Sequence, residues 1–517
     1  MTLARGAGFA ATGVILLLTF GTLGAVAWRA DGAAALGPAD WASIRFTVLQ
    51  SVLSAALSVA LAVPAARALA RRRFVGRGLL ITLLGAPFIL PVIVAVFGLI
   101  AVFGRAGLVN HGLALAGLEP VSIYGLPGVV LAHVFFNLPL ATRLILQGWA
   151  LIPPQRFALA AQLGMPPTGV FRHLEMPMLK EVLPGVLVTV FLLCLTSFAV
   201  VLALGGGPRA TTVELAIYQA FRFDFDLARA GLLALIQFGL CAVAALAAFA
   251  VGRPTAFGVG SSQYSGQWLG GGVGLQLVDI AILGLLSLFL LLPLAMIALA
   301  GLPALFTIPA LVFPAAFRSL LVALAAVTIS LSLALPMGWL IVQLRQKAVA
   351  RGVELVGYLS IAASPMVLGT GLFLLLFPLT GIAHLALPVT AVVNAAISLP
   401  FVLRAILPVL HQSERNFGRL TQSLGISGWG YFRLVLWPQL RPAAGFAAGL
   451  TAALSVGDLG VLTLFSSPGQ ETLPLVMYHL LAAYKTDAAG AVALVLVGLS
   501  LGLFWIFDQG GRVNADA

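Results

Sequence analysis

One carboxylate stands out because it interrupts a long apolar run. Asp458 lies sixteen residues into the run that begins near Pro442, within the motif Gly457-Asp458-Leu459-Gly460. A carboxylate in such a run is costly to bury unless it faces water or a partner, which favours a functional role. The alternative is a helix cap, because Asp readily accepts hydrogen bonds from nearby backbone amides. The sequence leaves both roles open.

Other chemistry-bearing motifs are missing from the sequence. There is no G-x-x-x-x-G-K-[ST], and none of the lysines Lys180, Lys347 and Lys485 follows a glycine. A loop that cradles the phosphates of ATP therefore cannot be assigned. The six histidines are too far apart along the chain to form a helical metal pair. We expect no catalytic residue, no metal and no cofactor in this chain, and we interpret His133 as a hydrogen-bonded packing residue.

The composition of the chain indicates an integral membrane protein. Of 517 residues, 61% are hydrophobic and 9% are charged, and the mean hydropathy is +1.10. These values exclude a soluble multidomain enzyme. Long unbroken apolar runs favour helices over a barrel, whose strands would alternate. The net charge is +12, but the basic residues do not cluster in a soluble domain. We therefore expect no nucleic-acid partner. Cys194 and Cys241 lie inside apolar runs and predict no disulfide.

The apolar runs predict about twelve transmembrane helices, so the fold class is an all-α integral membrane protein that contacts the lipid bilayer. The first run could be a signal peptide, but its length favours an uncleaved helix. Lys and Arg divide 20 to 8 between the two faces, which places both termini in the cytoplasm. The expected spans are 7–28, 44–69, 78–103, 124–149, 183–205, 229–251, 276–300, 316–344, 354–379, 386–410, 442–465 and 489–507.

The chain divides into two halves that resemble each other. Residues 253–274 are rich in Gly and Ser and predict a cytoplasmic linker between halves at 1–252 and 275–517. A shift of 261 aligns some forty residues, whereas a shift of 272 aligns the earlier motifs that end in Pro64 and Pro336. The first half therefore has extra loop residues, for which 104–123 is the best candidate. Six helices per half predict a parallel repeat.

The repeat is strongest in two cytoplasmic loops, at about 150–181 and 411–442. The interval from Gly164 to Pro177 is identical to that from Gly425 to Pro438. This pattern predicts a short helix before each glycine, a turn at the glycine, and a second helical segment that ends before the proline. A membrane-surface helix without a partner is the alternative, but the duplicated spacing favours a contact site.

These loops resemble those of the permeases of binding-protein-dependent ABC importers, whose motif is E-A-A-x-x-x-G-x9-I-x-L-P. Both copies keep the Gly and the Pro, but Ala158 and Arg419 replace the first Glu. The resemblance implies a type I importer permease fold and coupling helices that dock on a cytoplasmic ATPase. The coupling residues would be Leu163, Gly164, Phe171, Arg172, Pro177, Leu424, Gly425, Phe432, Arg433 and Pro438.

Further segments, among them 133–144, 204–220 and 457–460, resemble the fused permeases of bacterial thiamine and thiamine pyrophosphate importers. This resemblance implies three properties: a homodimeric cytoplasmic ABC ATPase as one partner, a periplasmic thiamine-binding protein as another, and an inner-membrane location. Fused ferric-iron permeases are the runner-up. A secondary transporter, which needs intramembrane carboxylates and often shows inverted repeats, is the alternative from another class.

Two further hypotheses follow from the topology. The shift of 261 pairs Asp458 with Ser197, so a candidate substrate pathway comprises Ser197, Phe198, Ser455 and Asp458, with the carboxylate attracting the cationic thiazolium ring that the resemblance implies.

On the external face, acids after spans five and eleven could dock the binding protein by complementary charge, or could simply be solvated. These acids are Glu214, Asp224, Asp226, Glu471 and Asp487.

Overall fold

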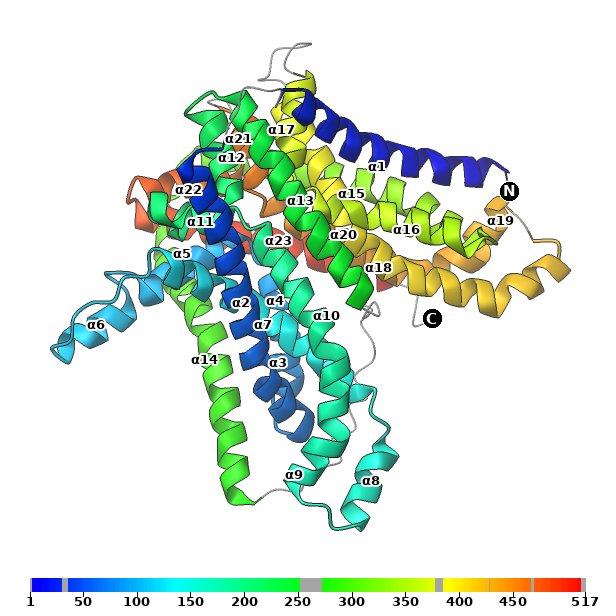
Figure 1. The fold of residues 1–517 in the computed structure, drawn as a ribbon, viewed down its shortest axis with the longest axis horizontal. Coiled ribbons are helices and arrows are strands. Elements are labelled where there is room, and N and C mark those ends of the chain that lie inside the picture. The colour runs from blue at the N-terminus through cyan, green and yellow to red at the C-terminus, as the bar shows by residue number, and fades with distance from the viewer. Residues whose placement is uncertain are drawn as a thin grey trace.

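The protein is built from helices in two splayed groups, as a computed structural model shows (Figure 1). The structure describes residues 2–29, 36–251, 272–376, 385–426, 428–465 and 469–512, and no strand occurs among them. Most of the predicted linker, residues 253–271, lies outside the described residues. The boundaries of the two halves therefore remain predictions.

Membrane-length helices confirm the predicted fold class. The described residues contain 11 such helices, or up to 12 if one bent pair counts as a single span. The bent pair joins Lys347–Ser360 to Pro365–Leu376 through 87° and occupies the predicted span 354–379. The predicted span 78–103 is also broken, into three helices that end before Gly85, near Pro91 and at Phe103. Proline removes a backbone donor, so it is tolerated at these breaks.

The first half contains α1 (Thr2–Arg29), α2 (Pro38–Arg71), α3 (Arg77–Leu83), α4 (Ala86–Ile89), α5 (Val92–Phe103), α6 (Leu108–Leu115), α7 (Leu126–Ala150), α8 (Pro154–Gln162), α9 (Pro167–Val170), a π-helical turn η1 (Phe171–Glu175), α10 (Met176–Leu195), α11 (Ala199–Leu204), a 3-10 turn η2 (Pro208–Ala210), α12 (Val213–Arg222) and α13 (Leu227–Val251). Helix α6 occupies the predicted extra loop 104–123.

The second half follows a similar order without counterparts of α6 and α8. It contains α14 (Val273–Ala304), a 3-10 turn η3 (Leu305–Thr307), α15 (Val312–Gln343), α16 (Lys347–Ala362), α17 (Pro365–Leu376), α18 (Ala386–Ser423), α19 (Gly428–Tyr431), a π-helical turn η5 (Phe432–Leu436), α20 (Trp437–Val456), α21 (Gly460–Phe465), α22 (Leu473–Ala482) and α23 (Thr486–Arg512). From α9 to α11 every helix bound recurs in the second half at the shift of 261.

The first helix of each half packs against the other half. Helix α1 lies on α15, α16 and α17, and α14 lies on α5 and α2. Both contacts are close because a glycine faces a carbonyl oxygen: a Cβ on Gly8 would lie 2.7 Å from the Pro336 oxygen, and one on Gly98 would lie 2.7 Å from the Pro293 oxygen. Small residues permit such close helix crossings in membranes. This exchange joins the two halves into one body.

Candidate functional site

The first coupling segment begins with a glycine turn. Helix α8 ends at Gln162, and Gly164 has a φ of +61°. The Met165 amide donates to the Ala160 carbonyl at 2.9 Å, which closes the turn as a Schellman motif. Ala160 and Val170 are buried against Met165, Phe157 and Leu174. The segment therefore has a small apolar core of its own.

The second coupling segment repeats this geometry. Gly425 has a φ of +66°, and the Ile426 amide donates to the Thr421 carbonyl at 2.9 Å. The predicted turn at each glycine is confirmed. No atom outside the immediate chain lies within 4 Å of a Cβ built on either glycine. Glycine is therefore favoured there by the positive φ alone.

Each coupling segment enters the next long helix through a π-helical turn. The amides of Met176 and Trp437 donate to the carbonyls of Phe171 and Phe432, five residues back. Pro177 and Pro438 follow directly. A proline ring in an α-helix clashes with the carbonyl four residues earlier, and a wider turn relieves that clash. The fixed spacing thus encodes a turn, a short helix, a π-helical turn and a proline.

Two details of the predicted loops are wrong. The second helical segment does not end before the proline, because the helix continues through Pro177 into α10 and through Pro438 into α20. The second loop also lacks a separate first helix, since α18 runs unbroken to Ser423. In the first half the pair Pro153-Pro154 ends the preceding helix, and the corresponding positions 414 and 415 are not proline.

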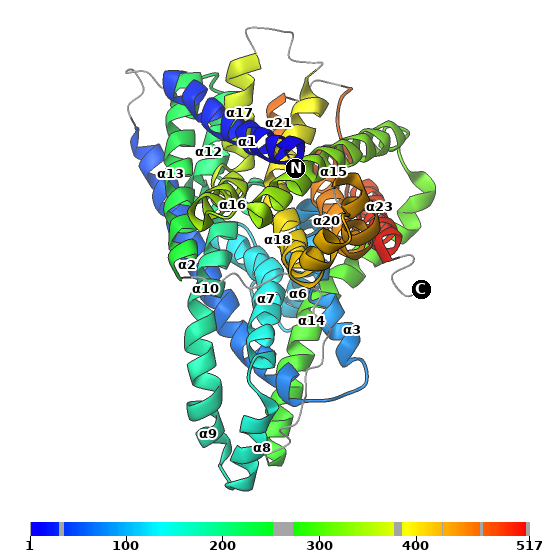
Figure 2. The same ribbon diagram turned by 90° about the vertical axis from the view of Figure 1, so that its right-hand side faces the viewer.

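The two segments lie at the ends of the two helix groups (Figure 1), and Figure 2 shows the first of them, α8 and α9, from the side. Both segments carry exposed apolar side chains. Leu163 is 69% exposed and its copy Leu424 is 63% exposed. Phe171 and Phe432 are half-buried, whereas Arg172, Arg433, Pro177 and Pro438 are exposed. The second segment adds further exposed apolar residues, which are Trp429, Leu434 and Trp437.

The candidate substrate pathway lies where several helices break. Helix α20 ends at Val456 and α21 begins at Gly460. Asp458 therefore lies in the break just before α21, which is the position that a helix cap occupies. Its Oδ1 accepts a hydrogen bond from the Gly460 amide at 3.1 Å, which confirms the capping role. A Cβ on Gly460 would lie 3.8 Å from both Phe198 and Pro365. The breaks from both halves therefore meet at this point.

Other polar side chains gather around these breaks. The Asn394 amide donates to the Ser455 hydroxyl at 3.0 Å and lies within reach of the Asp458 carboxylate. Ser197 is half-buried in the matching break between α10 and α11. Asn394 was missed by sequence reasoning, although the shift of 261 pairs it with His133. A search for polar residues at the repeat distance would have found it.

The first half has a different polar cluster at the equivalent level. The Ser54 hydroxyl lies 3.2 Å from His133 Nδ1, and His133 is 3% exposed, which confirms it as a hydrogen-bonded packing residue. The Gln50 amide donates to the Cys194 carbonyl at 3.0 Å, and the Asn137 amide to Cys194 Sγ at 3.3 Å. No group of three metal-ligating side chains occurs in the described ranges.

One of the five external acids is not at the surface. Glu214 is fully buried in α12, where its Oε1 accepts a hydrogen bond from the Gln237 amide at 2.9 Å. It cannot dock a partner, so its inclusion in the docking set was wrong. The hydropathy pattern predicted residues 206–228 as a loop between two spans, whereas α12 packs inward against α13, α2 and α17. Asp224, Asp226 and Asp487 are exposed, and Glu471 is half-buried.

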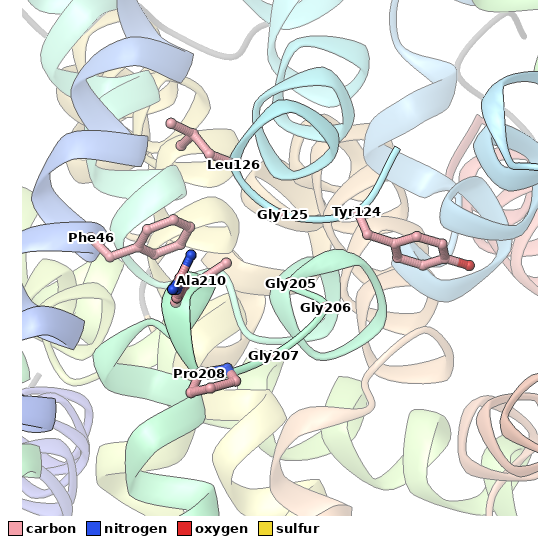
Figure 3. Close-up of a pocket in the computed structure, with 10 residues that line it drawn as sticks. Phe46, Tyr124, Gly125, Leu126, Gly205, Gly206, Gly207, Pro208 and Ala210 are labelled. Carbon is pink, nitrogen blue, oxygen red and sulfur yellow. The ribbon is translucent and has the colours of Figure 1, made fainter. Parts of the chain in front are cut away.

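An open cavity of about 460 Å³ lies between the ends of α7 and α11 (Figure 3). Phe46 and Tyr124 flank its glycine-rich loop, Gly205 to Gly207. Gly206 and Gly207 have φ values of +71° and +133°, and a Cβ on Gly206 would lie 3.0 Å from that of Tyr124. None of the predicted pathway residues lines this cavity.

The chain resembles known proteins over nearly its whole length. No family model matches it. Curated relatives named thiamine transport system permease protein ThiP include that of Brucella abortus strain 2308, 37% identical over 522 residues, which cover 99% of this chain and 96% of the relative. That of Salmonella typhimurium is 39% identical and covers 91% and 89%. That of Escherichia coli K12 is 38% identical and covers 92% and 90%.

Proposed function

The chain belongs to the family of bacterial thiamine transport permeases, and from this premise we propose how its parts divide the work of import. It is a multi-pass inner-membrane protein and the permease of an ABC importer for thiamine. The names of these relatives favour thiamine over the ferric iron of the runner-up family. Such permeases are not enzymes themselves, so the energy for import comes from another subunit.

ATP is hydrolysed by a separate homodimeric cytoplasmic ATPase that holds both coupling segments. The exposed Leu163 and Leu424 support this role, because they occupy the same position in two copies and apolar surface on a cytoplasmic loop favours a covering partner. Arg172 and Arg433 add one exposed cation to each copy. Closure of the ATPase dimer would push both segments, and the π-helical turns would pass this movement into α10 and α20.

Thiamine passes at the level of the helix breaks. Asp458 lies half-buried beside Phe198, and its second oxygen, Oδ2, has no hydrogen-bond partner among the described residues. A carboxylate at the point where these helix breaks meet suits a cationic ring. Ser455 and Ser197 would supply neutral hydroxyls on the two sides. The capping bond and the substrate contact are compatible, because they use different oxygens.

A periplasmic thiamine-binding protein delivers the substrate to the external face. Asp224, Asp226, Glu471 and Asp487 remain candidates for its docking by complementary charge. Asp224 and Asp226 are already engaged with Arg229, through an ion pair of 3.0 Å and a bond to the Arg229 amide of 2.9 Å. The positive-charge count places both termini in the cytoplasm, opposite this face.

The observation that carries this proposal is the duplicated glycine turn, π-helical turn and proline at the ends of the two helix groups. A deletion strain that cannot import thiamine provides the test. The chain, expressed with its ATPase and binding protein, should restore growth on low thiamine and should pull down the ATPase. Restoration of iron uptake instead, or of thiamine uptake without any ATPase, would contradict the proposal.

A further inference from the structure

We propose that an ionic cluster at the cytoplasmic end of α2 ties the first coupling segment to the opposite half and positions that segment for transmission. The cluster comprises Arg67, Arg71, Arg72, Glu175 and Asp279, and is called the α2 ionic cluster below. This inference rests on the coupling role proposed above and adds a positioning device to it.

The first link joins α2 to the coupling segment. Arg67 Nε donates to Glu175 Oε2 at 2.7 Å, and Glu175 is only 1% exposed. The Arg67 guanidinium also lies 4.7 Å from the centre of the Phe171 ring. Phe171 and Glu175 are the first and last residues of the π-helical turn. Arg67 therefore holds both ends of the turn that leads into α10.

The second link joins α2 to the other half. Arg72 Nε donates to Asp279 Oδ2 at 2.7 Å, and Arg71 Nη1 lies 3.7 Å from Asp279 Oδ1. Asp279 is 3% exposed and belongs to α14, the first helix of the second half. Arg67 and Arg71 are four residues apart, so they share one face of α2 about 6 Å from each other along its axis. One helical turn thus connects the two links.

The second half has no copy of this cluster. The shift of 272 pairs Arg67, Arg71 and Arg72 with Trp339, Gln343 and Leu344 of the second half. The same shift pairs Asp279, which lies in the second half, with Ala7 of the first half. The shift of 261 pairs Glu175 with Leu436. At the second coupling segment the Trp339 and Tyr431 rings lie 5.4 Å apart, and the Tyr431 hydroxyl lies 3.5 Å from both Ser413 and Glu414. Leu436 belongs to the same buried cluster as Tyr431. The two segments are therefore fixed by different chemistry.

This difference gives the first segment a special role. Removing one partner of a buried ion pair leaves an uncompensated charge, so such pairs resist separation and keep a fixed geometry. A displacement of the first segment must therefore carry the end of α2 and, through Asp279, α14 with it. Helix α14 also packs against α23. A displacement of the first coupling segment is thereby transmitted to helices of both halves.

The test measures ATP hydrolysed per thiamine transported by the full complex in proteoliposomes. We expect Glu175→Gln and Asp279→Asn to raise this ratio at least fivefold while the complex still assembles. Asp508→Asn is the matched control, since it breaks an ion pair of 3.0 Å with Arg512 that stays within α23. The control should keep the wild-type ratio. A purely structural role would lower the amount of complex without changing the ratio.

A double variant keeps the inference testable if a single variant fails to fold. Arg67→Glu combined with Glu175→Arg re-forms an ion pair between the same two positions, and should return the ratio to within twofold of wild type. A ratio as high as that of Glu175→Gln in the assembled double variant would overturn the proposal, as would a wild-type ratio in both single variants. Normal uptake by Gly164→Val and Gly425→Val would instead overturn the coupling role itself.

Discussion

Gly164 and Gly425, which the shift of 261 pairs, adopt the same left-handed conformation, with φ values of +61° and +66°. Each ends the helix that precedes a π-helical turn and a proline. Since no neighbouring atom restricts a Cβ at either position, only the backbone conformation selects glycine. This isolates the turn as a feature that substitution can test without disturbing the packing.

Replacing either glycine with valine should impair thiamine uptake. A β-branched residue disfavours the left-handed conformation by at least about 1–2 kcal/mol, which should displace the segment that follows. Asparagine tolerates this conformation and is the matched control, so Gly164→Asn and Gly425→Asn should keep most uptake. Uptake by membrane vesicles with equal amounts of permease is the measurement. Full transport by both valine variants would contradict the coupling role.

Asp458→Asn should insert normally but lower uptake. The Asn oxygen can still accept the bond from the Gly460 amide that now measures 3.1 Å, so the break between α20 and α21 should persist. The charge is lost, and we expect the KM for thiamine to rise about tenfold, which corresponds to about 1.4 kcal/mol. Concentration-dependent uptake would show this. A wild-type KM would leave Asp458 as a cap alone.

A duplicated side-chain bond should stabilise the external helices. The Val213 amide donates to the Thr47 hydroxyl at 2.9 Å, and the Leu473 amide donates to the Ser319 hydroxyl at 3.0 Å. Both bonds are buried, so Thr47→Val should leave an amide unpaired and cost about 1–3 kcal/mol. Thr47→Ser keeps the hydroxyl and should be nearly neutral. Thermal unfolding of the detergent-solubilised protein would separate the two, and equal melting temperatures would contradict the assignment.

Glu214 should make stability fall as the pH rises. Burial raises the pKa of this carboxyl from 4.5 to about 8, and α12 is not one of the membrane-length helices. Between these values the folded state binds the proton that the unfolded state has lost, so wild type loses stability from pH 4.5 to 8. Glu214→Gln cannot ionise. Its melting temperature should exceed that of wild type at pH 8 by more than at pH 5, and a constant difference would contradict the shift.

Features set by local patterns were predictable from the sequence. Apolar runs gave the long helices, the positions of Gly164 and Gly425 gave the turns, and Gly457-Asp458-Leu459-Gly460 gave the break. The exchange of α1 and α14 between the halves was not predictable, because it depends on packing between distant segments. The burial of Glu214 was missed because α12 is short and its hydropathy resembles that of a loop.

Ion pairs between distant segments were also not predictable from the sequence. Arg67 looked like one of many charges that fix topology, and Glu175 lay in a loop judged only by its Gly and Pro spacing. Nothing in the sequence aligned them, because the two residues fall in blocks with different repeat offsets. Comparing the two halves by residue type, rather than by similarity alone, would have shown that both members of this pair lose their charge in the second copy.

The most direct test of the account is thiamine uptake by proteoliposomes that contain the chain, its ATPase and the external binding protein. Uptake of labelled thiamine should require ATP on the coupling-segment side and should be competed by unlabelled thiamine, but not by ferric iron. The combined Gly164→Val and Gly425→Val variant should lose at least about tenfold in rate. ATP-independent uptake driven by a proton gradient, or undiminished ATP-driven uptake by that variant, would contradict the account.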